Sequence, residues 1–242
     1  MTAIETSSLP RGFDHVDAWV FDLDNTLYPS ACDLFAQVDQ KMAAYICDLL
    51  KVDLAEARRL QKEFYVEHGT TLSGLMAVHG CEPEPFLDFV HDIDVSGVMA
   101  DEALGAAISR LPGRKVVFTN GSVAHAENVL RQLGIDHVFD DIYDIVTAQY
   151  EPKPRRGAYD RFIEASGIEP SRAAMFEDIA RNLEVPHVLG MTTVWVRPGV
   201  AGPERHHQIS FEGGDGPHIH HVTDMLTEFL TSHCLVASTP AE

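Results

Sequence analysis

Cysteine is scarce in this sequence. Cys32, Cys47, Cys81 and Cys234 are the only four among 242 residues, and no two of them form a C-x-x-C pair. A disulfide framework or a cysteine-ligated zinc site needs more thiols at closer spacing. We therefore expect reduced thiols, as in proteins of a reducing compartment.

Long apolar runs are also missing. No stretch approaches the ~20 apolar residues that cross a bilayer. The first residues, "MTAIETSSLPRGFDHVDAW", lack the apolar region of a signal peptide. These features predict a cytoplasmic protein with no membrane partner.

Positive charge is the third scarcity. Eighteen Lys and Arg residues stand against 37 Asp and Glu residues, which gives a formal net charge of −19. So acidic a surface does not attract a polyanion, which argues against a nucleic-acid polymer as partner. A small anionic substrate remains compatible, because a bound metal ion reverses the field inside one pocket.

Short apolar runs alternate with helical periodicity over much of the chain. Strands are predicted at Ala18–Leu23, Lys115–Asn120, Asp144–Ala148, Ala173–Asp178 and Thr192–Arg197. Helices are predicted at Ser122–Gly134, at Arg155–Gly167, and at Val222–Leu230 with Met225, Leu226 and Phe229 facing inward. Between the last two strands, Pro186 predicts a kink or two short helices. The alternation predicts an α/β fold with a doubly wound, mainly parallel, Rossmann-like sheet.

An all-helical segment interrupts this alternation after the first strand. Leu34–Leu50 carries an apolar stripe at three- and four-residue spacing, and Asp53–Gly69 begins with a capping Asp and ends at a Gly. We predict a core domain formed by residues 1–30 and 110–242 and an inserted helical cap formed by residues 31–109.

Polar side chains gather where the predicted strands end. In chain order they are Asp22 and Asp24, then Thr119, Asn120 and Gly121, then Lys153, then Glu177 and Asp178. Ligands of open parallel sheets bind at the carboxyl ends of the strands. An isolated Asp-x-Asp is also a turn signal, but four such segments at one edge favour a site.

The residue types at this edge suit phosphoryl transfer. Crowded carboxylates need a cation among them, and Asp22, Asp24 and Asp178 offer the hard oxygen ligands that Mg²⁺ prefers. Lys153 adds positive charge for a phosphoryl group. Asp22 is placed to attack phosphorus, and Asp24 to protonate the leaving oxygen and later to activate water.

Four segments, "FDLDNTLY", "FTNGS", "EPKP" and "FEDIARNL", resemble in order and spacing the motifs of the haloacid dehalogenase-like superfamily. The resemblance implies Asp22 as nucleophile and Asp24 as general acid and base, with its main-chain carbonyl on Mg²⁺. It also implies Asp178 as a metal ligand and Lys153 beside nucleophile and phosphate. Thr119 and the neighbouring amides of Asn120 and Gly121 are then the expected phosphate binders.

Finer features narrow the resemblance. "DNTLYP", "HGTTLSGL" and "NLEVPHVLGM" resemble the pyrimidine 5′-nucleotidase-type subgroup. Dehalogenase members lack a carboxylate at the place of Asp24, which favours a phosphatase. Many members carry an acid where this chain has Asn182, so we expect Asn182 to orient water or Lys153, and Glu177 to stand behind the metal ligands.

Several alternatives stay open. The substrate is a small phosphorylated metabolite, and a pyrimidine nucleoside 5′-monophosphate competes with phosphoglycolate or a sugar phosphate. A phosphomutase and a non-enzymatic binding module are further readings, and the sequence sets no oligomeric state. The histidines at 206–207 and 218–221 lack partner ligands at metal spacing, so we expect surface or loop positions.

Overall fold

A six-stranded parallel sheet organises the core of the protein. The computed structural model describes residues 11–197 and 211–234. The strands are β1 (Ala18–Phe21), β2 (Arg114–Phe118), β3 (Asp141–Tyr143), β4 (Ala173–Glu177), β5 (Thr192–Val196) and β6 (His221–Thr223). They lie in the order β3-β2-β1-β4-β5-β6, and every neighbouring pair is parallel. This order confirms the predicted doubly wound, Rossmann-like fold.

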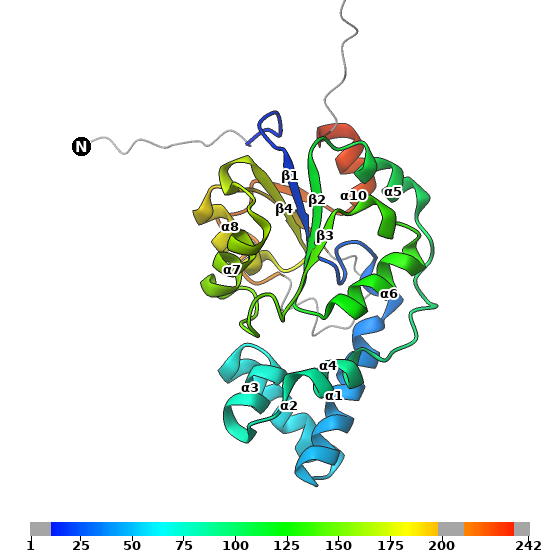
Figure 1. The fold of residues 1–242 in the computed structure, drawn as a ribbon, viewed down its shortest axis with the longest axis vertical. Coiled ribbons are helices and arrows are strands. Elements are labelled where there is room, and N and C mark those ends of the chain that lie inside the picture. Colours follow the sequence, from blue (N-terminus) through cyan, green and yellow to red (C-terminus); the bar gives the residue numbers. More distant parts are fainter. Residues whose placement is uncertain (1–10, 198–210, 235–242) are drawn as a thin grey trace, which may run out of the picture.

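Helices cover both faces of the sheet (Figure 1). One face carries α5 (Glu102–Ser109), α6 (Val123–Leu133) and α10 (Leu226–Phe229); the other carries α7 (Arg156–Ser166) and α8 (Glu184–Leu189). All four residues of β1 are therefore buried. Trp19 and Phe21 join the core on one face, and Ala18 and Val20 join the core on the other. This explains the uninterrupted apolar run, since both faces of a parallel sheet are covered.

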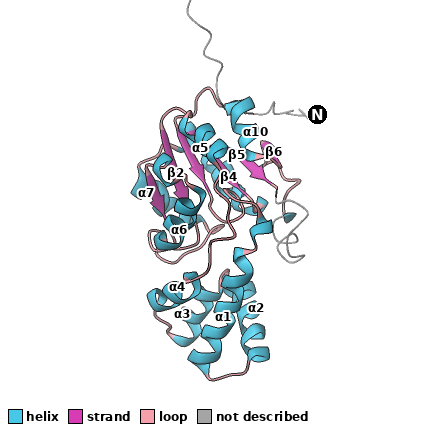
Figure 2. Ribbon diagram, turned by 90° about the vertical axis from the view of Figure 1, so that its right-hand side faces the viewer, coloured by secondary structure: helices cyan, strands magenta, loops and turns pink. Residues whose placement is uncertain are grey.

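Four helices between β1 and β2 form a separate layer beside the carboxyl edge of the sheet (Figure 2). They are α1 (Leu34–Leu50), α2 (Leu54–His68), α3 (Thr71–His79) and α4 (Pro83–His91). Asp53 caps α2 by accepting from the Glu56 amide, as the sequence predicts. The layer has its own core, in which Ile46, Leu75 and Val90 are fully buried. We call these four helices the cap.

Helix α5, which follows the four cap helices, packs elsewhere. Leu104 and Ile108 of α5 belong to the same buried cluster as Phe21 of β1. Residues 102–109 therefore lie against the sheet, although the sequence analysis placed them in the inserted segment.

The predicted strand at Asp144–Ala148 is wrong. The third strand is β3, three residues earlier, and residues 145–150 form turns. The Asp144 carboxylate accepts hydrogen bonds from the Val123 amide at 3.1 Å and from the amide of Thr147 at 2.9 Å. The bond to Thr147 is local and favours a turn over pairing with a neighbouring strand. The apolar residues of this segment therefore belong to the turn.

The predicted helix at Val222–Leu230 is wrong in its first half. Val222 lies in β6 and pairs with Trp195 of β5, so the sheet edge takes residues that the apolar pattern assigns to a helix. Helix α10 follows and continues as a π-helix at Leu230–Cys234. Leu226 and Phe229 are buried as predicted, whereas Met225 is exposed.

The segment with Pro186 divides as predicted. A 3₁₀ turn at Ala180–Leu183 precedes α8, and Pro186 lies in the first turn of that helix, where no amide hydrogen is needed. All four cysteines are free, and none of the described helices is long and apolar enough to cross a membrane.

Candidate active site

The predicted site residues meet where the winding of the sheet reverses. Asp22 and Asp24 follow β1, and Asp178 follows β4, which lies beside β1 at the centre of the sheet. A crevice forms at this switch point in doubly wound sheets because the connections leave to opposite sides. The fold thus joins segments that are more than 150 residues apart in the chain.

Both carboxylate oxygens of Asp22 are held. Lys153 Nζ donates to Oδ1 at 2.7 Å, and Thr26 Oγ1 donates to Oδ2 at 2.9 Å. Asp22 is buried, and its amide continues the ladder to Phe176 at 2.9 Å. A buried carboxyl group fixed on both sides has the orientation that a nucleophile requires.

Lys153 is fully enclosed at the centre of the site. Besides Asp22, its Nζ donates to the Phe118 carbonyl at 2.8 Å and lies 3.5 Å from Glu177 Oε1. Burial lowers the pKa of this ammonium group, but the charges of Asp22 and Glu177 outweigh burial and raise the pKa. Lys153 therefore stays protonated at neutral pH.

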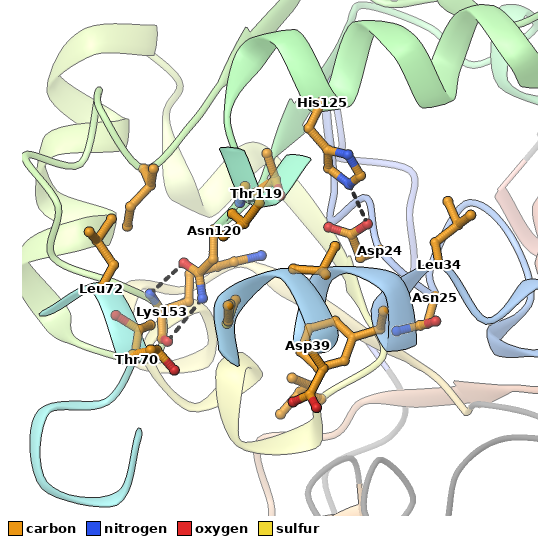
Figure 3. A pocket seen from close by; sticks show the side chains of 18 of the residues that line it. Asp24, Asn25, Leu34, Asp39, Thr70, Leu72, Thr119, Asn120, His125 and Lys153 are labelled. Atoms are coloured by element: carbon orange, nitrogen blue, oxygen red, sulfur yellow. Dashed lines mark hydrogen bonds and ion pairs between the residues drawn. The ribbon is translucent and has the colours of Figure 1, made fainter. Parts of the chain in front are cut away.

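Asn120 fixes the backbone of Lys153. Its Oδ1 accepts from the Lys153 amide at 2.9 Å, and its Nδ2 donates to the Lys153 carbonyl at 3.3 Å (Figure 3). Asn120 follows β2, so the pair joins the second and third motif segments. The resemblance assigned only a backbone role to this residue, and its side chain adds a positioning role.

Three buried carboxylates, Asp22, Glu177 and Asp178, have oxygens within 4.8 Å of one another. Burial, together with the charge of Asp22, raises the pKa of Glu177 and of Asp178 well above the usual values. Three carboxyl groups thus crowd around the single ammonium group of Lys153, and a further cation among them would favour their ionised form. A divalent cation with hard oxygen ligands fits this donor set.

Both oxygens of Glu177 accept hydrogen bonds from residues that follow it in the chain. Oε1 accepts from Asn182 Nδ2, and Oε2 accepts from the Asp178 amide at 3.0 Å. The arrangement agrees with a supporting position for Glu177 and Asn182 behind the predicted ligands Asp22 and Asp178.

Asp24 is held by two residues that the sequence analysis missed. Tyr28 Oη donates to Asp24 Oδ1 at 2.6 Å, and His125 Nε2 lies 2.8 Å from the same oxygen (Figure 3). Burial raises the pKa of this carboxyl group. The charge and hydrogen bond of His125 and the hydrogen bond of Tyr28 outweigh burial, so the pKa is lowered to about 2. Tyr28 lies inside the first motif, whereas nothing in the helix of His125 singles it out.

The phosphate-binding residues predicted after β2 directly precede the N-terminus of α6. Thr119 is buried, and its Oγ1 accepts from the Gly121 amide at 2.9 Å. Ser122 caps α6 by accepting from the His125 amide at 3.3 Å. A helix N-terminus beside a buried hydroxyl suits an anion.

A cavity of about 360 Å³ connects these residues to the cap. Its floor holds Asp22, Asp24 and Lys153. Apolar side chains from the cap line its other side: Leu34, Val38, Met42, Leu72, Phe86, Leu87 and Val90. Arg181 on the core side donates to Tyr65 Oη of α2 at 2.8 Å, which links core and cap.

Two curated proteins share parts of this sequence. "Enolase-phosphatase E1" of Sorangium cellulosum is 34% identical over 89 residues, which are 35% of this chain and 37% of that protein. "Phosphate metabolism protein 8" of Saccharomyces cerevisiae is 26% identical over 151 residues, which are 57% of this chain and 46% of that protein. The matches thus span less than half of either relative.

Two solved structures share the fold. L-2-haloacid dehalogenase from Xanthobacter autotrophicus has a TM-score of 0.52 at 16% identity, over 89% of this chain and 97% of that one. The HAD-hydrolase YfnB from Bacillus subtilis bound to magnesium has a TM-score of 0.55 at 15% identity, again over 89% and 97%. The family model for haloacid dehalogenase-like hydrolases matches residues 16–187. The chain therefore belongs to the haloacid dehalogenase-like hydrolase family.

Proposed function

We propose that this protein is a Mg²⁺-dependent phosphatase that hydrolyses a pyrimidine nucleoside 5′-monophosphate through an aspartyl-phosphate intermediate. The observation that carries the proposal is the environment of Asp22, whose two oxygens are fixed by Lys153 and Thr26 beside Asp178. The two curated relatives named for phosphate chemistry support the reaction class.

The first step is attack of Asp22 on phosphorus. Lys153 holds the Asp22 carboxylate and places a positive charge next to the incoming phosphoryl oxygens. Asp22 and Asp178, with the Asp24 main-chain carbonyl, would hold Mg²⁺. When bound, the ion neutralises phosphoryl charge and draws the phosphate to Asp22.

Asp24 serves the leaving group. With a pKa of about 2, its carboxylate is ionised before the substrate binds. In the first step it takes the proton that a monoanionic phosphate ester brings and passes it to the alkoxide oxygen, and in the second it takes a proton from the water that attacks the aspartyl-phosphate. Its side chain is 30% exposed towards the cavity, whereas His125 behind it is 2% exposed. Asp24 is thus open to substrate and water on one side and supported on the other.

The cavity favours a flat, uncharged leaving group. Apolar side chains line its cap side, next to polar ones such as Asp39, Gln61 and Thr70. Among the described residues that line the cavity, the lysine and arginine side chains are Lys153 and Arg181. Lys153 is engaged by Asp22, and Arg181 contacts Tyr65 and, at 3.4 Å, Glu212. A nucleobase gains from apolar walls, whereas the carboxylate of phosphoglycolate gains less.

Phosphate release from a panel of esters tests the proposal. The panel holds pyrimidine and purine 5′-monophosphates, phosphoglycolate and sugar phosphates, each with Mg²⁺ and with chelator. We expect fast, Mg²⁺-dependent release that is highest for UMP and CMP. Asp22→Asn should abolish turnover without unfolding the protein, while the exposed Asp88→Asn serves as the matched control.

The other outcomes separate the alternatives. Mg²⁺-dependent release from another ester would keep the chemistry and replace the substrate. Transfer of the phosphoryl group to a second hydroxyl, with no phosphate that carries label from isotopic water, would indicate a phosphomutase. No release from any ester would favour a binding module, and turnover of haloacids would favour a dehalogenase.

A further inference from the structure

We propose that His125 positions the carboxyl group of Asp24 for leaving-group protonation, and that His91 of the cap makes this positioning depend on cap closure. The inference rests on the proposed phosphatase function. It assigns positioning roles to two histidines that lie outside the four motif segments.

His125 fixes one rotamer of Asp24. Its Nε2 lies 2.8 Å from Asp24 Oδ1, the oxygen that also accepts from Tyr28 Oη at 2.6 Å. Neither bond uses Oδ2. With Oδ1 held from two sides, the carboxyl group cannot rotate freely, and Oδ2 is the oxygen left to face a substrate.

His125 is itself weakly anchored within the core. Its ring is buried, and Nδ1 has no hydrogen-bond partner within residues 11–197 and 211–234. A buried ring with one polar contact relies on packing for its orientation. The packing partner therefore determines how firmly Asp24 is held.

That partner comes from the cap. The His91 ring, at the end of α4, stacks on the His125 ring with a centroid distance of 4.6 Å and an interplanar angle of 15°. His91 Nδ1 lies 3.0 Å from Ser122 Oγ, and Ser122 is the N-cap of the helix that carries His125. His91 of the cap thus contacts both the His125 ring and Ser122, the residue that begins the helix of His125.

Gly121 makes room for this stack. A Cβ atom at Gly121 would lie 3.2 Å from His125 Cδ2 and 3.7 Å from His91 Nε2. The glycine that the sequence analysis assigned to phosphate binding therefore also permits the two rings to approach. When the cap moves away, the stack and the Ser122 contact are lost, and Asp24 loses part of its support. Protonation of the leaving group is then efficient only in the closed state.

Two esters with different leaving groups test the positioning role. An alkyl ester such as a nucleoside 5′-monophosphate needs a proton on the departing oxygen, whereas p-nitrophenyl phosphate releases a stable anion and does not. His125→Ala should lower kcat/KM, which reports the steps up to release of the alcohol, about 10- to 100-fold on the alkyl ester and by no more than about threefold on p-nitrophenyl phosphate. His125→Gln, which retains a donor, should recover part of the loss.

His91 variants test the coupling to the cap. His91→Ala should show the same ester-selective loss at a smaller magnitude, about three- to tenfold, and His91→Phe, which keeps the stacked ring, should recover much of it. The exposed His137→Ala should behave as wild type on both esters. Thermal unfolding of each variant excludes loss of folded protein, and His125→Gln carries the test if His125→Ala does not fold.

An equal loss on both esters, or no loss on either, would overturn the role of His125. A wild-type ratio in His91→Ala would overturn the coupling. Failure of the wild-type enzyme on both esters would instead reject the proposed function, so the two failures are distinct.

Discussion

Lys153 Nζ lies 2.7 Å from Asp22 Oδ1, although 131 residues separate the two in the chain. The contact exists because β1 and the segment after β3 deliver their polar residues to one edge of the parallel sheet. Lys153 also faces Glu177 at 3.5 Å, so one ammonium group serves two buried carboxylates. It therefore bears on both the activity and the stability of the core.

Lys153→Met should leave the buried carboxylates of Asp22 and Glu177 without the ammonium group that lies against them. We expect a loss of about 10²- to 10³-fold in kcat and of about 3 kcal/mol in the free energy of unfolding, since buried carboxylates lose their counter-charge. Phosphate release and urea denaturation measure the two effects. Lys51→Met, which removes an exposed lysine 2.7 Å from Asp48, should cost less than about 0.5 kcal/mol. Equal costs for the two variants would contradict the role of Lys153.

The Lys153–Asp22 pair was predictable because each residue stands at a strand end or in a motif with fixed spacing. The central strands were predictable for a related reason, since burial on both faces leaves a continuous apolar run. The resemblance of the four motif segments added the expected role of Thr119 in phosphate binding, which spacing alone leaves open.

The support of Asp24 was not predictable. His125 lies in a helix whose apolar stripe accounts for its neighbours, and His91 lies at the end of a cap helix. Neither periodicity nor spacing shows that these two rings meet. The short strands β3 and β6 were missed for a similar reason, because pairing with a neighbouring strand decides them rather than local propensity.

Asn120→Ala should slow turnover without a large loss of stability. The side chain makes two hydrogen bonds to the Lys153 backbone, at 2.9 and 3.3 Å, so its removal lets the ammonium group shift. We expect about a tenfold fall in kcat and a loss of about 1–2 kcal/mol in stability.

The matched control is Asn128→Ala, which removes an exposed amide whose Oδ1 accepts from Arg131 at 3.0 Å. It should leave both quantities close to wild type. An Asn120→Ala enzyme with full activity would show that Lys153 holds its place through Asp22 alone.

Mg²⁺ should stabilise the folded protein through Asp178. At a free concentration of 100 times Kd, a ligand of the folded state adds about 2.7 kcal/mol to the free energy of unfolding. We expect chelated wild-type protein to gain a comparable amount on Mg²⁺ addition, and Asp178→Asn to gain much less, as measured by urea denaturation.

Asp178→Asn has a second expected effect that needs no metal. In chelator it should be at least as stable as wild type, because one of three crowded, buried carboxylates is removed. Asp88→Asn should respond to Mg²⁺ as wild type does. A full Mg²⁺ response in Asp178→Asn would remove this residue from the ligand set.

His220 should make the protein less stable as the pH falls. Its Nδ1 accepts from the Thr193 amide at 3.0 Å, and its Nε2 lies 3.0 Å from His187 Nδ1, so the ring is held neutral. Burial, followed by the positive charges of neighbours such as His187 and Arg11, lowers the pKa of His220 from 6.5 to about 4. Of the predicted surface or loop histidines at 218–221, His218 is in fact buried and His220 partly buried, while the positions at 206–207 lie outside the described residues.

The sign of the effect follows from proton binding. Between pH 6.5 and pH 4 the unfolded chain binds a proton at His220 and the folded protein does not, so protonation favours unfolding. The stabilisation is complete above pH 6.5 and declines towards pH 4. After a discount for the partial exposure of the ring, we expect this group to cost about 1 kcal/mol of stability between pH 7 and pH 5.

His220→Asn keeps an acceptor for the Thr193 amide but does not titrate, so urea denaturation should show a pH dependence shallower by that amount. His137→Asn, at an exposed site, should keep the wild-type slope. A His220→Asn slope equal to wild type would mean that the charged ring is accommodated in the folded protein.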